Sequence, residues 1–313
     1  MSQRPARHNP SPLPQRDGVA ASYVWLPQGE WPDLLTFLLS RFPQVSEATW
    51  RSRMARGEVM DAQGAVLGPH SAFRRGQQIF YYRELEQETP IPFQETILFQ
   101  DEHLLVVDKP HFLPVIPSGR FLQETLLVRL KNRFNLPHLT PIHRLDRETA
   151  GVVVFSHQPA SRGAYQALFQ QRVVDKVYEA LAPSPEAAGV TLAFPLLRTS
   201  RIEQGEPFFT MREVAGEANA ETRLEILAQY GAVNLYRLLP LTGRTHQLRV
   251  HMAALGLPIV NDAFYPVALP CKGDDVSQPL QLLARSLGFD DPLTGARREF
   301  VSQRQLLSPL CQN

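Results

Sequence analysis

The hydrophobic residues of this chain follow two different spacings, which predict a mixture of helices and strands. In "LLTFLLSRF" near the N-terminus they recur at helical intervals, and Ser46 can cap a second helix that runs through Trp50 and Met54 to Gly57. The segments "EVMDAQGAVLG" and "QQIFYY" then predict a hairpin and a closing strand. Because helices and strands are mixed without strict alternation, we expect an α+β fold rather than a doubly wound sheet.

The same reasoning predicts a larger set of elements in the second part of the chain. Short apolar runs in "TILFQDEHLLVVDKP" predict two strands, the second ended by Pro110, and the unbroken run Val152–Phe155 predicts a buried strand. Helices are predicted in "FLQETLLVRLKNRF" and "PASRGAYQALFQQR". Further strands are expected in "VVDKVYEALA", "ETRLEILAQYG" and "VNLYRLLPL". The segment "TGRTHQLRVHMAALG" should turn from strand into a helix that ends at Gly256.

Proline content and charge divide the chain into three expected parts. Residues 1–22 contain several prolines and few apolar residues, so we expect a disordered tail. Residues 23–88 should form a small α/β domain and the start of a linker. Residues 89–313 should form one larger α+β domain, because this length is enough to bury a sizeable core.

Composition limits the classes of function. The formal net charge of +1 argues against a uniformly basic nucleic-acid binder, so RNA or DNA binding would need local patches. One such patch is expected between residues 41 and 83, where seven arginines outnumber three acidic residues. The two cysteines, Cys271 and Cys311, lack paired spacing, which argues against disulfides or zinc and favours the cytoplasm. No apolar run is long enough to span a bilayer, and the N-terminus lacks the apolar core of a secretory signal.

The segment "TPIHRLDRETAGVVVFS" (140–156) places a dense group of charges directly before a buried strand. The simplest interpretation is a structural ion pair between Asp146 and Arg144 or Arg147. A kinase catalytic loop is excluded, because Leu145 interrupts His-Arg-Asp and no glycine-rich phosphate loop is present. A metal site is not favoured, because the histidines lack ligand spacing. The remaining interpretation is an aspartate that acts on a sugar or nucleobase and is kept ionised by arginines.

Other segments of the chain accompany this motif, and together they resemble the motifs of one known family. "HRLDRETAGVVVF" resembles the signature of pseudouridine synthases of the RluA type, which isomerise uridine in ribosomal or transfer RNA. The segments "LLVVDKP", "DKVYEALA", "TGRTHQLRVHMAALGLPIVND" and "LLARSLGFDDPLTGARREF" resemble the other motifs of that family, in the same order, across residues 97–300. The ordered set is far more specific than a four-residue string. It implies a mixed, mainly antiparallel sheet with flanking helices and a central cleft, and an enzyme that needs no cofactor and no metal.

The resemblance also implies roles for individual residues. Asp146 would act at ribose C1′, either by attacking it or by removing a ribose proton, with Arg249 as its charge partner. Tyr178 resembles the active-site tyrosine and could stack on uracil and relay the proton that leaves C5. Arg144 resembles the arginine that enters the RNA stack when the target base flips out. From the residues alone, Tyr178 could equally be a half-buried strand tyrosine, and Arg144 a second ion-pair partner of Asp146.

The small N-terminal domain resembles the alpha-L RNA-binding module of a ribosomal small-subunit protein. The likeness rests on two short helices, the "RGEV" turn and the "GQQI" closing strand. It implies sequence-independent phosphate contacts. The arginines expected to make them are Arg51, Arg53, Arg56, Arg74 and Arg75. The alternative is a structural appendage with a solvated arginine face.

We therefore expect a cytoplasmic, monomeric RNA pseudouridine synthase that acts on ribosomal large-subunit RNA or transfer RNA. Two other classes of function remain open at this point. A nucleoside N-glycosylase could use the same aspartate and would release free uracil. A non-catalytic RNA-binding protein, such as a ribosome assembly factor, would not need the catalytic residues at all.

Overall fold

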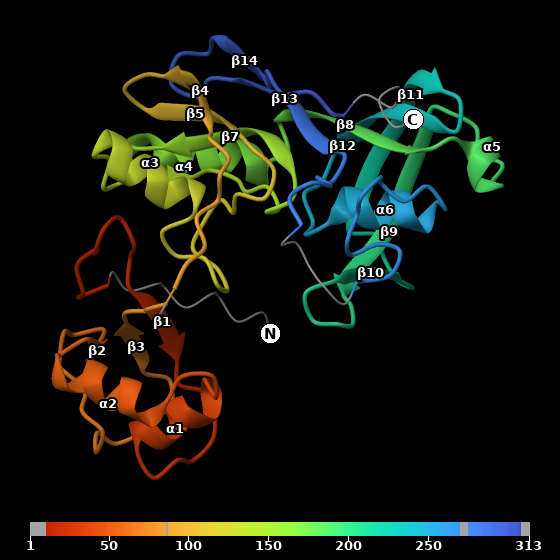
Figure 1. Cartoon of the computed structure of the whole chain (residues 1–313). Helices are drawn as coiled ribbons and strands as arrows, with labels where there is room; N and C mark the ends of the chain where they lie inside the picture. Colours follow the sequence, from red (N-terminus) through yellow and green to blue (C-terminus); the bar gives the residue numbers. More distant parts are fainter. Residues whose placement is uncertain (1–10, 86, 270–274, 308–313) are drawn as a thin grey trace. The chain divides into compact units, whose positions relative to one another are not determined.

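The structure, a computed structural model, describes residues 11–85, 87–269 and 275–307, and the chain divides into two compact units (Figure 1). The first unit comprises Met1–Glu88 together with Gly119–Gln123. The second unit comprises Thr89–Ser118 and Glu124–Asn313. No helix in the described ranges has both the length and the apolar character that a membrane span requires.

The first unit is a three-stranded antiparallel sheet packed against two helices. Its strands have the order β1 (Ser22–Trp25), β3 (Gln78–Tyr81) and β2 (Val59–Asp61), and its helices are α1 (Leu34–Arg41) and α2 (Glu47–Ala55). The predicted cap of α2 is present, because the Ser46 hydroxyl accepts a hydrogen bond from the backbone N–H of Thr49. Trp50 on α2 is fully buried between the two helices and the sheet, so the amphipathic pattern of the sequence defines the core of this unit.

The N-terminal segment differs from the expectation of a disordered tail over residues 11–22. The Leu13 side chain is buried against Phe80 and Tyr82, and the Tyr82 hydroxyl donates a hydrogen bond to the carbonyl oxygen of Pro14 at 2.7 Å. The guanidinium of Arg16 lies 3.7 Å from the centre of the Tyr82 ring. Composition does not reveal these partners, because they come from the far end of the unit. Residues 1–10 lie outside the described residues.

The second unit is built on one large mixed sheet. The main order of its strands is β10-β9-β11-β12-β8-β13-β7-β5-β4, with β14 beside β13 and β6 beside β7. The bounds are β4 (Thr96–Gln100), β5 (Leu104–Lys109), β6 (Thr140–Pro141), β7 (Ala150–Ser156), β8 (Asp175–Pro183), β9 (Leu196–Gln204), β10 (Met211–Val214), β11 (Ala220–Tyr230), β12 (Val233–Pro240), β13 (Leu282–Asp290) and β14 (Arg297–Val301). Among the described strands of this sheet, only the β13–β7 pair is parallel. The expected α+β class with a mainly antiparallel sheet is therefore confirmed.

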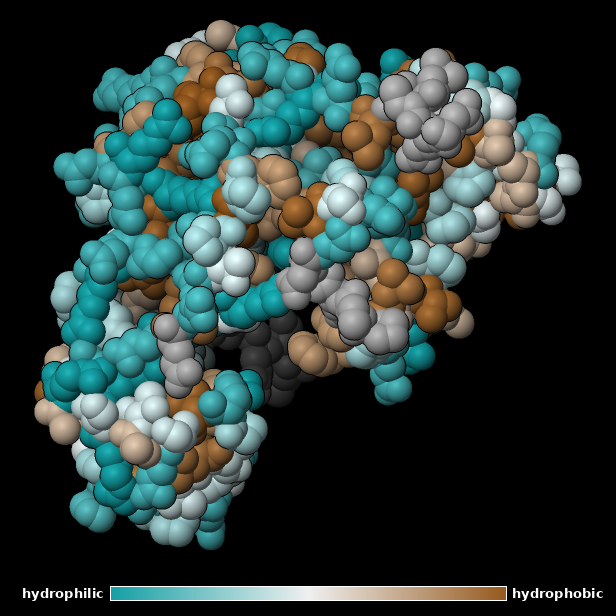
Figure 2. All heavy atoms as spheres, in the orientation of Figure 1, coloured by the Kyte–Doolittle hydropathy of each residue, from teal (hydrophilic) through white to brown (hydrophobic). Residues whose placement is uncertain are grey.

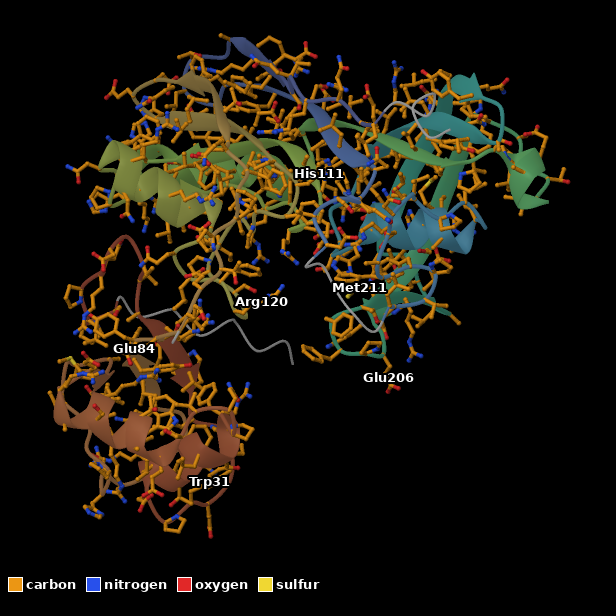
Figure 3. The ribbon with its side chains drawn as sticks, viewed as in Figure 1. Trp31, Glu84, His111, Arg120, Glu206 and Met211 are labelled. Carbon is orange, nitrogen blue, oxygen red and sulfur yellow. The ribbon has the colours of Figure 1, made fainter. Side chains whose placement is uncertain are left out.

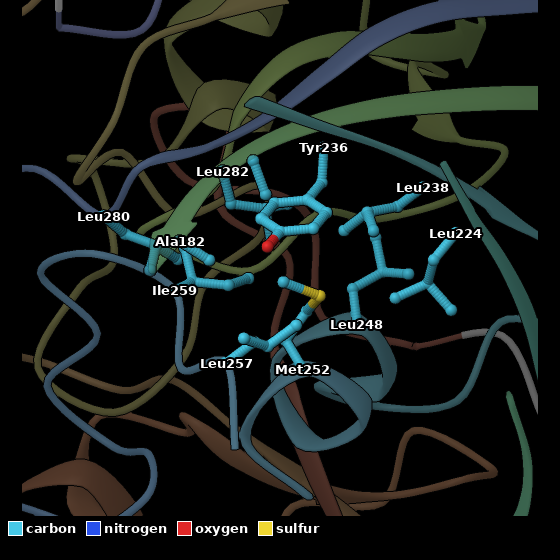
Figure 4. Close-up of a cluster of buried hydrophobic side chains, with 11 residues drawn as sticks. Ala182, Leu224, Tyr236, Leu238, Leu248, Met252, Leu257, Ile259, Leu280 and Leu282 are labelled. Atoms are coloured by element: carbon cyan, nitrogen blue, oxygen red, sulfur yellow. The ribbon is translucent and has the colours of Figure 1, made fainter. Parts of the chain in front are cut away.

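Helices cover the two halves of this sheet separately (Figure 1). Their bounds are α3 (Leu126–Phe134), α4 (Pro159–Gln170), α5 (Pro185–Ala188) and α6 (Gln247–Ala254). Tyr165 of α4 packs in a core formed with β5, β7 and β13. Met252 of α6 packs in another core with Tyr236 and Leu238 of β12 (Figure 4). The two cores hold the helices α4 and α6 against neighbouring parts of one sheet.

The junction between the halves depends on a glycine. Gly151 at the start of β7 pairs with Ala284 of β13 and has φ of 116°. A Cβ atom at Gly151 would lie 2.2 Å from the carbonyl oxygen of Ala284, which no side chain can tolerate. This close approach brings the loop before β7, which contains Asp146, to the place where the halves of the sheet meet.

Some elements were not predicted from the hydrophobic pattern. β9 and β10 carry charged residues at close intervals and have no apolar run, so they give a weak strand signal. Their hydrogen bonds to β11 and to each other stabilise them nevertheless. The predicted helix in "TGRTHQLRVHMAALG" is present as α6, and Gly256 follows it with φ of 76°.

Candidate active site

A cleft of about 710 Å³ opens in the second unit beside the loop that contains Asp146. Its walls come from this loop, from β8, from the residues around 114–118, and from the segment that joins β12 to α6. Six basic side chains line it: Arg144, Arg147, Arg172, Lys176, Arg244 and Arg249. Asp146 is the single carboxylate among the described lining residues. A positive cleft around one negative group suits a phosphate-rich ligand with a reaction centre at the carboxylate.

Asp146 is held in a short turn between β6 and β7. The N–H of Thr149 donates a hydrogen bond to the Asp146 carbonyl oxygen at 3.2 Å, and Leu145 beside it is buried. The Asp146 side chain is 28% exposed, so its carboxylate faces the cleft while its backbone is anchored. A ligand in the cleft can reach this group.

Arg249, in the first turn of α6, is oriented by a buried aspartate. Its Nε and Nη2 donate hydrogen bonds to Asp262 at 2.8 and 2.6 Å, and the Arg249 side chain is 1% exposed. Its remaining nitrogen, Nη1, lies 3.7 Å from Oδ2 of Asp146 and 3.7 Å from Oε2 of Glu148, and has no hydrogen-bond partner among the described residues. Burial by itself lowers the pKa of Arg249, but the hydrogen bonds to Asp262 and the nearby carboxylates raise it, so the group stays charged.

His246 is a second neighbour of Asp146. Its Nε2 lies 3.9 Å from Oδ2 of Asp146, and its Nδ1 lies 2.8 Å from the Tyr265 hydroxyl. Burial lowers the pKa of His246, so the imidazole is neutral at pH 7. The Tyr265 oxygen also accepts the N–H of Met211 at 2.8 Å, so Tyr265 joins His246 to the first residue of β10.

Tyr178 lines the same cleft from β8, where it pairs with Leu238 and Ala284. Burial raises the pKa of Tyr178, and the negative charge of Asp146 raises it further. The phenol is therefore neutral at physiological pH. The structure thus brings Asp146, Tyr178 and Arg249 to one cleft from three separate elements.

Lys109 anchors the loop that contains Asp146 and was not singled out from the sequence, although it stands in the "DKP" segment. Its Nζ donates hydrogen bonds to the carbonyl oxygens of Pro110, Leu113 and Arg147 at 3.0, 2.8 and 3.0 Å. Complete burial lowers the pKa of Lys109 to about 7. Lys109 therefore joins the end of β5 to the loop of Asp146.

Arg144 and His143 are neighbours in the sequence but have different surroundings in the structure. Arg144 is exposed and lines the cleft, and no ion pair joins it to Asp146 within 4 Å in the described structure. The ring of His143 stacks on Phe169 with centroids 4.8 Å apart, and its Nε2 accepts the N–H of Val154 at 3.2 Å. Burial lowers the pKa of His143 to about 3, which indicates a neutral structural residue. No group of three candidate metal ligands occurs in the described part of the chain.

The arginines of the first unit have unequal surroundings. Arg53 is 4% exposed, lies 3.6 Å from Glu84 through Nε, and packs over the Trp50 ring, which is the setting of a structural residue rather than a phosphate contact. The other four are exposed. Arg51 pairs with Glu47, Arg56 pairs with Glu58 and Glu84, and Arg75 donates to Gln28.

The fold and the site define a class of enzyme, which comparison with known proteins identifies. Residues 103–254 match the family model described as RNA pseudouridylate synthase. The chain is 32% identical to ribosomal large subunit pseudouridine synthase D of Pseudomonas aeruginosa, over 83% of this chain and 85% of that protein. It is 35% identical to the dual-specificity RNA pseudouridine synthase RluA of Vibrio vulnificus, over 66% of this chain and 82% of that protein.

Solved structures agree. Human RNA pseudouridylate synthase domain containing 1 superimposes with a TM-score of 0.55 and 25% identity, covering 70% of this chain and 86% of that chain. Human RNA pseudouridylate synthase domain containing 4 gives a TM-score of 0.51 and 27% identity, covering 67% and 88%. The chain belongs to the RluA-type family of RNA pseudouridine synthases, and the prediction of that family from its motifs is confirmed. It is an isomerase that converts uridine to pseudouridine in RNA.

Proposed function

We propose that Asp146 is the catalytic carboxylate of this enzyme. The observation that carries the proposal is that Asp146 is the single carboxylate among the described residues that line a basic cleft, and that it lies 3.7 Å from Nη1 of Arg249. In the isomerisation the bond from ribose C1′ to uracil N1 breaks and a bond from C1′ to C5 forms. C5 loses a proton and N1 gains one. Asp146 supplies the oxygen that acts at the ribose.

Arg249 places a buried positive charge beside Asp146, with Nη1 at 3.7 Å from Oδ2 of Asp146. Because Asp262 fixes two nitrogens of Arg249, the third, Nη1, is held close to Asp146 and Glu148 with little freedom to turn away. Arg249 is therefore the charge partner, and Asp262 positions it.

Tyr178 provides an aromatic face for the uracil ring. Its raised pKa keeps the phenol protonated, so Tyr178 is a poor base by itself. A neutral ring beside the carboxylate can stack on the base while it turns between its two attachments. Arg144, exposed on the rim of the cleft, is suited to fill the gap that the flipped uridine leaves in the RNA.

The RNA substrate that we propose is ribosomal large-subunit RNA or transfer RNA. One of the two relatives is named a ribosomal large subunit pseudouridine synthase, and the other a dual-specificity RNA pseudouridine synthase. Residues 23–88 would act as an alpha-L-like RNA-binding module and residues 89–313 as the catalytic domain. Arg51, Arg56, Arg74 and Arg75 are the exposed candidates for phosphate contacts. We further propose that the enzyme works as a monomer in the cytoplasm, where these RNAs are present.

The experiment replaces Asp146 with asparagine and measures the release of tritium from uracil C5 in stable RNA of a strain that lacks the gene. Asp146→Asn should lower the single-turnover rate by about a thousandfold or more, with the melting temperature and RNA affinity largely retained. The matched control is Asp290→Asn, an exposed carboxylate at the end of β13. A folded Asp146→Asn enzyme with near wild-type rate would remove Asp146 from the mechanism. Mapping pseudouridine in the same RNA identifies the target, and free uracil in the reaction would indicate a glycosylase.

A further inference from the structure

The turn between β9 and β10 displays an aromatic ring to solvent. Phe208 is 79% exposed, more than any other large apolar residue in the described ranges. Figure 3 shows the neighbouring Glu206 at the far end of this hairpin, and Figure 2 shows hydrophobic residues grouped where Figure 1 places β10. A single exposed apolar residue is common on protein surfaces. Whether Phe208 has a function depends on how the turn is stabilised and on which residues Phe208 contacts.

The turn is ordered by its own hydrogen bonds. The N–H of Gly205 donates to the carbonyl oxygen of Thr210 at 2.9 Å, and the N–H of Thr210 donates to that of Pro207 at 2.8 Å. The side chain of Gln204 donates through Nε2 to the carbonyl oxygen of Phe208 at 2.7 Å. The ring is thus presented from a fixed backbone, which reduces the entropy that binding would cost.

A series of aromatic rings leads from Phe208 into the cleft. Phe208 contacts Phe209 with ring centroids 5.6 Å apart, Phe209 contacts Phe264 at 5.6 Å, and Phe264 contacts His246 at 5.5 Å. His246 lines the cleft and faces Asp146. Each spacing is typical of packed aromatic pairs, so the series is one continuous contact. Its inner end is at the site of reaction and its outer end is exposed.

A hydrogen-bonded link joins the hairpin to the same histidine. The hydroxyl of Tyr265 accepts the N–H of Met211, the first residue of β10, and lies 2.8 Å from Nδ1 of His246. The position of the hairpin relative to Asp146 is therefore fixed by packing and by hydrogen bonds.

We propose that Phe208 is a stacking contact for an unpaired base of the substrate RNA close in sequence to the target uridine. An exposed ring gains little from paired RNA, whose surface is phosphate and ribose, but it can stack on the face of an extruded or single-stranded base. The proposal rests on the RNA pseudouridine synthase activity and adds a specificity contact outside the cleft. It implies that the target lies in a loop, bulge or other unpaired segment.

The test compares Phe208→Ala, Phe208→Leu and Phe208→Trp in single-turnover tritium release, with stable RNA from the gene-deletion strain as the probe. Loss of one base–aromatic stack should raise the RNA concentration for half-maximal rate about tenfold in Phe208→Ala, with the rate at saturation within about twofold of wild type. Phe208→Trp should restore the wild-type value, and Phe208→Leu should not, because leucine is apolar but has no ring to stack. The matched control is Tyr230→Ala, which replaces an exposed aromatic residue at the C-terminal end of β11.

Three results would overturn the proposal. The first is an unchanged half-saturating RNA concentration in Phe208→Ala. The second is equal restoration by leucine and tryptophan, which would indicate an apolar contact without stacking. The third is a molar mass of Phe208→Ala, measured by light scattering, that differs from that of wild type while the RNA affinity is the same. This result would show that the hairpin is a contact between copies of the chain. Inactive wild-type enzyme in the same assay would instead count against the activity itself, so the two failures are distinguishable.

Discussion

Nη1 of Arg249 lies 3.7 Å from Oδ2 of Asp146, and the other two guanidinium nitrogens of Arg249 are bound to Asp262. The residue that orients the charge partner is thus itself buried and outside the lining of the cleft. Catalytic groups commonly depend on such supporting contacts for their geometry. The arrangement makes Asp262 a position where a change of charge should affect the reaction without contact to RNA.

We expect Asp262→Asn to lower the single-turnover rate by roughly 10- to 100-fold while RNA affinity stays near wild type. The amide cannot accept two charge-assisted hydrogen bonds, so Arg249 should turn away from Asp146. Removing one member of a buried ion pair typically costs about 3–5 kcal/mol, so the melting temperature should fall as well. Asp290→Asn again serves as the control, and an unaltered rate in folded Asp262→Asn would show that Arg249 needs no such support.

Arg144→Ala should slow turnover much more than it changes the melting temperature. The reason is that Arg144 is exposed and makes no ion pair with Asp146, so its loss leaves the fold intact but leaves the gap in the RNA unfilled. A fluorescent base placed beside the target should report less flipping. Arg223→Ala, which removes an exposed arginine from β11, is the control. A large drop in melting temperature with normal flipping would assign Arg144 a structural role.

Lys109 should make stability depend on pH in a defined direction. Burial lowers the pKa of Lys109 to about 7, whereas an unfolded lysine titrates near 10.4. Between these pH values the unfolded chain binds the extra proton, so this group disfavours folding most at and below pH 7 and less as pH rises. The slope of the unfolding free energy from this group is up to about 1.4 kcal/mol per pH unit.

The measurement is denaturant unfolding of wild type and Lys109→Met between pH 6 and 10. The variant loses three hydrogen bonds to carbonyl oxygens but also the cost of a buried charge, and the wild type should gain stability relative to it as pH rises above 7. Parallel curves for the two proteins would contradict the lowered pKa.

The exposed arginines of the first unit should contribute to the salt dependence of RNA binding. Replacing Arg74 and Arg75 together by glutamine should reduce the log–log slope of affinity against salt by up to about two units, one for each lost phosphate contact. Arg53→Gln should behave differently, because this buried arginine packs on Trp50 and pairs with Glu84, and its loss should destabilise the unit. An unchanged slope in the double variant would show that these arginines do not contact RNA.

Much of the organisation of this protein was determined by the sequence itself. Helix caps, apolar runs and turn residues are local signals, so α2 with its Ser46 cap, the buried strand β7 and the end of α6 at Gly256 were predictable. The ordered motifs were enough to indicate the family, because they are specific strings of residue types. β9 and β10 were missed, because pairing with neighbouring strands rather than an apolar pattern holds them in place.

Only the tertiary structure decided the surroundings of each charged group. Nothing local in the sequence shows that Asp262 fixes Arg249, that Lys109 is bonded to the loop of Asp146, or that Arg53 is buried. The same holds for the rings that connect Phe208 to His246. Most of these contacts join different strands, helices and loops, so they depend on how strands pair and how helices pack. The sequence therefore indicated the class of reaction, and the three-dimensional fold determined which side chains can take part in it.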